Sequence, residues 1–329
     1  MAEITAGKLP KRDSIFLQML KGISLIRESG VGMIGTGIVS FWVLIAIFAD
    51  VLAPFPPNAQ HVSMAKPGTE YIVSGSQKVK IGRAEALASE ACVPLVEDGA
   101  EVEGQFHCGT FWLGADQLGR DILSRIIHGS RTVLIYAPLA TFFAYLVGIP
   151  MGLAAGYMRG VTDDVLSFIA NVILSFPVLV LYIIIISLYG ASALNIIFAV
   201  TFASGPSIMR IVRGLVLDLR NREYVFAAQT RGEPGWRIML VEILPNARGP
   251  LIVDSCLRLG YVIITIGVLG FLGLGLPPPD PDWGGMINEN RAVAMIFPHM
   301  TVFPCIAISS LVLGFNLMAD GLREISLRD

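Results

Sequence analysis

The chain has 329 residues, of which 54% are hydrophobic and only 15% are charged. Because soluble domains carry about 25% charged residues, this composition argues against a soluble globular protein and indicates an integral membrane protein. The formal net charge of −2 leaves no basic surface field, so the composition also argues against a nucleic-acid partner.

Five windows without charged residues predict six membrane-spanning helices, because a helix needs about 20 apolar residues to cross a bilayer core of about 30 Å. The third window is long enough for two helices, and Leu188–Asn195 offers the turn between them. The fifth helix is expected to begin near Pro250, ahead of its charge-free window. In chain order the windows are Ser29–Ala49, Thr132–Met158, Val165–Met209, Leu259–Pro279 and Ala292–Ala319.

The distribution of Lys and Arg predicts that both ends of the chain are cytoplasmic. Basic residues cluster in the N-terminal tail, between the fourth and fifth predicted helices, and after the sixth, and six spans put all three on one side. The predicted organisation is a cytoplasmic tail with an amphipathic patch (1–30), a first helix (31–53), an extracytoplasmic loop (54–131) and a core of five further helices (132–329).

The loop after the first helix contains two short β-prone runs around a Ser-Gly-Ser turn, within Glu70–Gly82, which predict a hairpin. Cys92 and Cys108 are the two cysteines of this loop. We expect them to form a disulfide, because thiols outside the cytoplasm can be oxidised and no other pairing is open to them there.

Three glycines in the second predicted helix, Gly148, Gly152 and Gly156, share the four-residue spacing that puts small residues on one helix face. We expect them to form a packing seam against another helix, with a substrate-lining role as the alternative. Pro177, in the third helix, is expected to introduce a kink, as prolines do in membrane helices.

Residues that carry catalytic or metal chemistry are scarce. No G-x-x-x-x-G-K-[ST] motif occurs, so the chain should hold no P-loop for ATP. The four histidines lack metal-ligand spacing, which predicts no metal site. No acid or histidine is expected to lie buried at mid-span, which argues against a proton-coupled secondary transporter. Asp254 and Arg258, four residues apart, are expected to form a structural pair near the membrane interface.

The polar segment 222–246 predicts a helix–turn–helix on the cytoplasmic face. Gly232 is a natural helix end, and Pro234 suits the first turn of a second short helix, which Pro245 should end. The first helix would carry a face with small residues, which favours docking against another protein over an ordinary loop. That face consists of Tyr224, Ala227, Ala228 and Arg231.

Several segments resemble those of ABC importer permeases. Glu223–Asn246 resembles their EAA loop, and Phe111–Leu134 resembles the signature before the second span of the dipeptide, oligopeptide and nickel permeases. Phe271–Ile287 resembles the segment that ends the fifth span in the same proteins. The resemblance covers 111–329 and the first span, and it is strongest for the second, C-type permease subunit.

The resemblance implies an all-α polytopic membrane protein with six transmembrane helices, a cytoplasmic EAA coupling-helix loop and an extended extracytoplasmic loop after the first helix. It implies a permease of the bacterial inner membrane that works by alternating access, performs no catalysis and binds no cofactor itself. Expected partners are a homologous second permease, two ATPase subunits that bind ATP and Mg, an extracytoplasmic binding protein and membrane lipid. The motif residues carried over to the ATPase-coupling loop are Glu223, Tyr224, Ala227, Ala228, Gly232, Ile238, Leu244 and Pro245.

Di- and oligopeptides are the substrates that the resemblance implies, and oligosaccharides and nickel chelates are the alternatives that related systems carry. An ion-coupled secondary transporter and a non-transporting membrane adaptor are alternatives of another class. Three residues depart from the family pattern. Glu233 and Glu242 are expected to tune the ATPase interface, and Ile266, where related permeases often carry Glu, is expected to face the substrate path.

Overall fold

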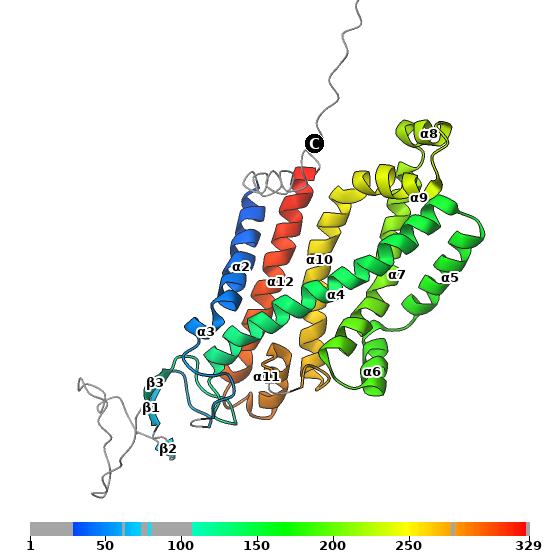
Figure 1. Cartoon of the computed structure of the whole chain (residues 1–329). Helices are drawn as coiled ribbons and strands as arrows, with labels where there is room; N and C mark the ends of the chain where they lie inside the picture. Colours follow the sequence, from blue (N-terminus) through cyan, green and yellow to red (C-terminus); the bar gives the residue numbers. More distant parts are fainter. Residues whose placement is uncertain (1–28, 61–62, 74–77, 80–106, 278–279, 327–329) are drawn as a thin grey trace, which may run out of the picture.

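The computed structural model describes residues 29–60, 63–73, 78–79, 107–277 and 280–326. This part of the chain is a bundle of long helices with a short sheet at one end (Figure 1). Within these described residues, five helices are long and apolar enough to cross a membrane, and one bent pair makes a sixth span when counted together. The five are α2 (Gly30–Ile47), α4 (Ile122–Met158), α7 (Ala193–Leu219), α10 (Leu244–Phe271) and α12 (His299–Ser326). The predicted all-α polytopic fold is confirmed.

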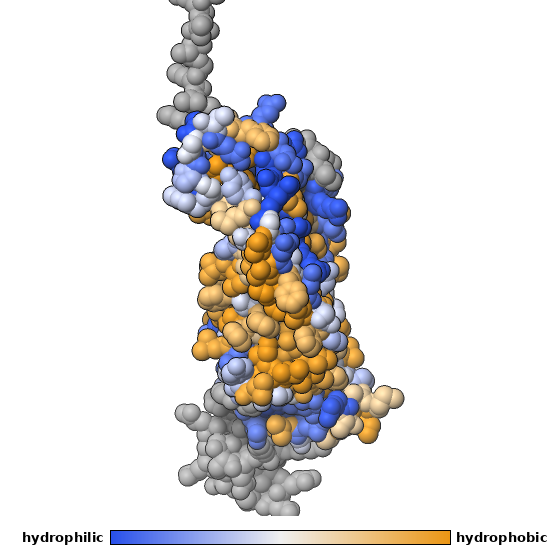
Figure 2. Space-filling model, turned by 90° about the vertical axis from the view of Figure 1, so that its right-hand side faces the viewer, coloured by the Kyte–Doolittle hydropathy of each residue, from blue (hydrophilic) through white to orange (hydrophobic). Residues whose placement is uncertain are grey.

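The surface divides as expected for a protein that crosses a bilayer. Figure 2 shows apolar residues gathered in the middle of the visible face, with hydrophilic residues at the end that carries α8 (Glu223–Thr230). Every one of the long helices exposes large apolar side chains, among them Ile34, Phe142, Phe198, Ile264 and Ile306. Soluble monomers rarely expose so much continuous apolar surface, so this exterior suits lipid.

The bent pair is α5 (Val161–Ser175) and α6 (Val178–Tyr189), which meet at 87°. Pro177 lies at the break, because proline has no N–H to donate and disfavours helical backbone at the residue before it. Phe176 accordingly adopts extended dihedral angles, with φ −81° and ψ 139°. The predicted kink is therefore a full break. The predicted turn after this pair is confirmed, since α6 ends at Gly190 with φ +87°.

α4 begins ten residues earlier than predicted, at Ile122 instead of Thr132, so the loop before it is shorter than expected. Charged residues are tolerated in its first turns because they find partners. Arg131 donates to the Ala46 carbonyl at 3.1 Å and to the exposed carboxylate of Asp50 at 3.0 Å. Absence of charge is thus too strict a criterion for where this helix starts.

The chain between the last two spans is also structured. The short helix α11 (Trp283–Asn290) and a 3-10 turn, η3 (Arg291–Val293), precede α12, which begins at His299 rather than at Ala292. Together with the one-turn helix α3 (Ala49–Leu52), these segments form the end of the bundle opposite α8 (Figure 1).

The three glycines of the predicted seam lie against α7. Cβ atoms built at Gly148, Gly152 and Gly156 would lie 2.6, 2.5 and 2.7 Å from the Cβ atoms of the facing side chains. Those side chains are Ile208, Val212 and Val216, all completely buried. The absence of a side chain at each glycine therefore lets the α4 and α7 backbones approach closely, as small residues do in membrane bundles.

A three-stranded sheet, in the order β2-β1-β3, lies at the same end as α11. It consists of β1 (Thr69–Val73), β2 (Lys78–Val79) and β3 (His107–Phe111). The predicted hairpin is confirmed, because β1 and β2 pair antiparallel. Cys92 of the predicted disulfide lies outside the described residues, and Cys108 stands in β3 opposite Ile72, so the bond stays a prediction.

Candidate functional sites at the two ends of the bundle

The segment 222–246 projects from one end of the bundle as a short helix that turns back (Figure 1). α8 is followed by Gly232, whose φ of +75° is the left-handed conformation expected of a glycine stop. No atom lies within 4 Å of a Cβ built there, so glycine is needed for its backbone conformation and not for space. The second helix, α9 (Gly235–Arg237), starts after Pro234 as predicted.

The prediction that the second helix ends at Pro245 is wrong. α9 continues through a π-helical turn, η2 (Ile238–Ile243), directly into α10, so Pro245 lies in the first turn of a membrane span. In that turn the Leu244 N–H bonds to the Met239 carbonyl, five residues back, and proline is tolerated where its missing N–H is not required. From Gly235 onward, the projecting segment and the fifth span therefore form one continuous helical arm.

The predicted small-residue face of α8 is not a single exposed surface. Val225 and Ala228 are completely buried and pack in one cluster with Ile238 and Ile243 of η2. The exposed side carries Phe226 instead, with 53% of its surface exposed. The structure leaves Glu223, Ala227 and Gly232 exposed, half-buries Tyr224, Leu244 and Pro245, and buries Ala228 and Ile238.

An ion-pair cluster joins the end of α8 to the arm. Arg231 contacts Glu233 at 2.9 Å and Glu242 at 3.7 Å, and Arg237 contacts Glu233 at 3.7 Å. The two acidic departures from the family pattern are thus partners of arginines within the loop. Because both arginine side chains are more than half exposed, each pair adds little stability and serves mainly to orient α8. The expected tuning of an ATPase interface by these residues stays a prediction.

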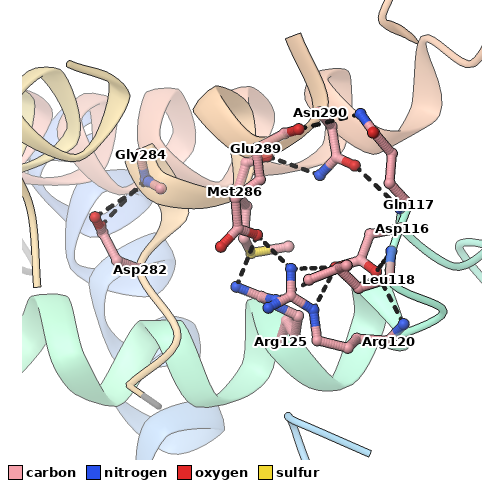
Figure 3. A network of polar contacts seen from close by, with 11 residues as sticks. Asp116, Gln117, Leu118, Arg120, Arg125, Asp282, Gly284, Met286, Glu289 and Asn290 are labelled. Carbon is pink, nitrogen blue, oxygen red and sulfur yellow. Dashed lines mark hydrogen bonds and ion pairs between the residues drawn. The ribbon is translucent and has the colours of Figure 1, made fainter. Parts of the chain in front are cut away.

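At the opposite end of the bundle, four charged side chains join the residues before and at the start of α4 to α11 (Figure 3). Arg120 lies 2.7 Å from Asp116 and also pairs with Glu289, and Arg125 lies 3.3 Å from each of these carboxylates. Asp116 and both arginines are buried, whereas the Glu289 side chain is 35% exposed. Two cations and two anions balance, which offsets part of the cost of taking the charges out of water.

Backbone and amide groups reinforce the same contact. Asp116 Oδ1 accepts from two N–H groups of its own turn, at 2.9 Å each. The Gln117 side chain donates to the Glu289 carbonyl at 3.1 Å, and its backbone N–H donates to Asn290 Oδ1 at 3.3 Å (Figure 3). The family-like segment before α4 therefore meets the end of α11, just beyond the family-like segment Phe271–Ile287. Sequence reasoning missed this contact because no local pattern links the two.

Trp283 locks α11 into the bundle. Its side chain is completely buried, and its indole N–H donates to the Ile126 carbonyl of α4 at 3.0 Å. Its ring meets Trp42 of α2 edge-on, with the ring centroids 5.0 Å apart. A Cβ built at Gly129 would lie 2.6 Å from this ring, so α4 needs a glycine where the indole passes. One side chain thus ties α11 to two membrane helices.

Asp282 caps α11 from a buried position. Its two carboxylate oxygens accept from the N–H groups of Gly284 and Gly285, at 3.2 and 3.1 Å. Burial favours the neutral acid more strongly than these hydrogen bonds favour the anion, and Glu289 adds repulsion, so the pKa of Asp282 is raised to about 6.

This raised pKa predicts a pH dependence of stability. A carboxyl whose folded-state pKa exceeds its unfolded value contributes stability that is fully present at pH below about 4 and is lost as the pH rises through about 6. Relative to Asp282→Asn, the wild-type protein should therefore lose about 1 kcal/mol of stability between pH 5 and pH 7.5. Thermal midpoints in detergent at the two pH values measure this difference, with Asp280→Asn at an exposed neighbouring carboxylate as the control. A difference that grows with pH would contradict the prediction.

Two expectations for the membrane interior have different outcomes. Ile266 is buried to 1% exposure in the main hydrophobic core, so the prediction that it faces a substrate path is wrong. Asp254 and Arg258 do pair, at 2.8 Å, but near the middle of α10 rather than at its end, so one largely buried acid does lie within a span, contrary to expectation. In the described part of the chain, no group of three or more His, Cys, Asp or Glu residues could hold a metal ion.

Comparisons with known proteins agree with this architecture. Residues 148–328 match the family described as binding-protein-dependent transport system inner membrane component, and residues 26–67 match the N-terminal TM domain of oligopeptide transport permease C. The chain is 40% identical over 213 residues to the glutathione transport system permease protein GsiD of Pectobacterium atrosepticum, which covers 65% of this chain and 71% of that protein.

A second relative and one solved structure extend the comparison. The chain is 38% identical over 213 residues to the dipeptide transport system permease protein DppC of Alkalihalophilus pseudofirmus, covering 65% of this chain and 70% of the relative. A chain of the MetNI methionine ABC transporter, in an inward facing conformation, superposes with a TM-score of 0.52 at 17% identity. That match covers 62% of this chain and 97% of the other, and it shows a shared fold.

Proposed function

Because the chain belongs to the family of binding-protein-dependent transport system inner membrane components, we propose that it forms, with a second homologous permease, a path for peptides across the bacterial inner membrane. It is a C-type, peptide-type permease subunit of an ABC importer. In this proposal an extracytoplasmic binding protein delivers the peptide, and two separate ATPase subunits bind ATP and Mg and drive its passage. The chain itself contributes binding and movement, and no bond chemistry.

The named substrates of the relatives support the substrate class. One relative is a dipeptide permease, 38% identical to this chain, and the other is a glutathione permease, 40% identical. Both substrates are short peptides with free carboxylates. Oligosaccharides and nickel chelates remain the alternative cargoes that an uptake experiment separates from peptides.

The observation that carries the coupling mechanism is the continuous arm from Gly235 to Phe271. α8 is fastened to this arm by the buried contacts of Val225 and Ala228 and by the Arg231 ion pairs. A displacement of α8 is therefore passed to the fifth span without a flexible joint. The exposed ring of Phe226 is the apolar anchor that a groove on an ATPase would receive.

We propose that α8 and both chain ends face the cytoplasm. The start of α2, the end of α12 and α8 lie at one end of the bundle (Figure 1). Lys and Arg cluster in the sequence segments at this end, as the positive-inside rule requires of cytoplasmic segments. The sheet and α11 then face outward, where a binding protein delivers its load.

The test replaces Phe226 by Asp in the complete complex of both permeases, the ATPases and the binding protein, reconstituted in proteoliposomes. A carboxylate cannot enter an apolar groove without a large desolvation cost. We therefore expect ATP-driven uptake of radiolabelled dialanine to fall by about tenfold or more, together with loss of the ATPases from the purified complex.

Phe226→Leu is the matched control, because it keeps an apolar side chain at the same place, and it should retain most of the uptake. Wild-type uptake and normal ATPase association in the Asp variant would refute the role of α8. If the wild-type complex takes up a labelled oligosaccharide or a nickel chelate but neither dialanine nor glutathione, the peptide assignment is refuted while the permease assignment stands.

A further inference from the structure

Within the membrane-spanning part of the bundle, α4, α6, α7 and α10, together with Leu174 of α5, line a cavity of about 430 Å³. Seven of the side chains that line it are polar: Thr141, Tyr182, Ser204, Ser207, Arg258, Tyr261 and Thr265. Among the described residues that line the cavity, Arg258 alone carries a formal charge. It stands fourteen residues after Leu244 and thirteen before Phe271, hence near the middle of α10.

The guanidinium of Arg258 is held in a fixed orientation. Its Nε donates to Asp254 at 2.8 Å, and its Nη1 donates to Ser207 Oγ, also at 2.8 Å. Asp254 accepts a further hydrogen bond from the Tyr145 hydroxyl, and Ser207 donates to the Ser204 carbonyl at 2.9 Å. Three helices therefore position one arginine, whose side chain is only 15% exposed.

From this arrangement we infer that the cavity is a binding site for a carboxylate of the transported molecule, with Arg258 as its recognition group. The inference rests on the proposed function. A buried arginine–carboxylate pair is costly, and an apolar pair would pack the helices at least as well. Ionisable side chains inside membrane spans generally face a water-filled cavity and mark a substrate path. The planar guanidinium suits a carboxylate, which it can bind through two parallel hydrogen bonds.

The division of roles follows from the lining. Asp254 and Tyr145 lie behind the arginine and orient it, and the cavity presents the cation together with four hydroxyl-bearing residues from α4, α6 and α7. A volume of about 430 Å³ is within the range of small-molecule sites and admits the carboxyl end of a short peptide. Arg258 is thus a specificity-determining residue for cargo with a free carboxylate.

The test measures the charge preference of the cavity directly. The measurement uses the assembled complex in phosphatidylcholine nanodiscs without anionic lipid. In this chain Ser204 is replaced by Cys, and the four native cysteines are replaced by Ser: Cys92, Cys108, Cys256 and Cys305. The labelling rate of this thiol is measured with an anionic and with a cationic methanethiosulfonate. The ratio of the anionic to the cationic labelling rate should be about tenfold higher with Arg258 present than in Arg258→Gln. Arg213→Gln, which removes an arginine paired with Asp163 outside the cavity, should leave the ratio unchanged.

A second measurement tests whether the cavity binds a carboxylate, and it needs no change at Arg258. Millimolar dialanine should slow the labelling of the Ser204→Cys protein by several-fold, whereas dialaninamide at the same concentration should not. Arg258→Lys should keep the charge preference but weaken the protection by dialanine, because an ammonium does not bind a carboxylate through a planar fork.

Equal protection by the acid and the amide, or a reagent ratio unaffected by Arg258→Gln, would overturn the inference. Protection that appears only when anionic lipid is added to the nanodiscs would assign the site to a lipid headgroup and would also overturn it. Failure of the proposed function is separately visible, because the wild-type complex would then show no ATP-driven uptake of dialanine whatever the labelling ratios are.

Discussion

Replacing Gly284 by Ala is expected to destabilise the protein by about 3 kcal/mol, because the added methyl group has no space. A Cβ at this position would overlap the carbonyl oxygen of Gly267 in α10, a backbone atom that no change of side-chain rotamer can move. α11 would have to shift away from α10, and the buried ring of Trp283 would lose its fit against α2 and α4. The thermal midpoint of the purified protein should fall by roughly 5–10 °C.

The neighbouring glycine provides the matched control. A Cβ at Gly285 would meet Asp282 Oδ2 at 3.4 Å, an ordinary van der Waals contact. Gly285→Ala should therefore change the midpoint far less than Gly284→Ala, although both substitutions add one methyl group to the same helix. Equal midpoints for the two variants would show that α11 is not packed against α10 as described.

Replacing Asp116 by Ala is expected to cost about 3–5 kcal/mol, because it leaves two buried arginines with one shared partner. Arg120 and Arg125 are 8% and 4% exposed, and Glu289 alone would then face both cations. The loss should appear as a lower thermal midpoint and as faster proteolysis of the segment before α4, which Asp116 also holds through its own turn.

Asp50→Ala is the control for this second variant. Asp50 also pairs with an arginine at the same end of the bundle, at 3.0 Å from Arg131, but its side chain is 71% exposed. Removal of such a pair should leave the midpoint almost unchanged, because water solvates the remaining charge. If Asp116→Ala were as mild as Asp50→Ala, the buried network would not be what holds α11 to α4.

Structural features that depend on residues close together in the chain could be predicted from the sequence. The apolar windows identified the membrane helices, because twenty-residue apolar segments have few other stable locations. The β-prone runs predicted the β1–β2 hairpin, and Gly232 was expected to end α8 because a positive φ favours glycine at a helix end. Motif resemblance was likewise enough to predict the family to which the chain belongs. Each of these inferences depends on residues a few positions apart.

The tertiary structure decided what depends on partners distant in sequence. Pro177 lies at a break between two helices, whereas Pro245 lies within a continuous helical arm. The neighbouring backbone, and not proline itself, sets this difference. Ala228 faces inward and Phe226 outward only because η2 packs against one side of α8. Arg120 meets Glu289, and Asp254 meets Tyr145, across more than 100 positions of sequence. The contribution of a charged side chain to stability depends on its partner and its burial, and neither can be read from the local sequence.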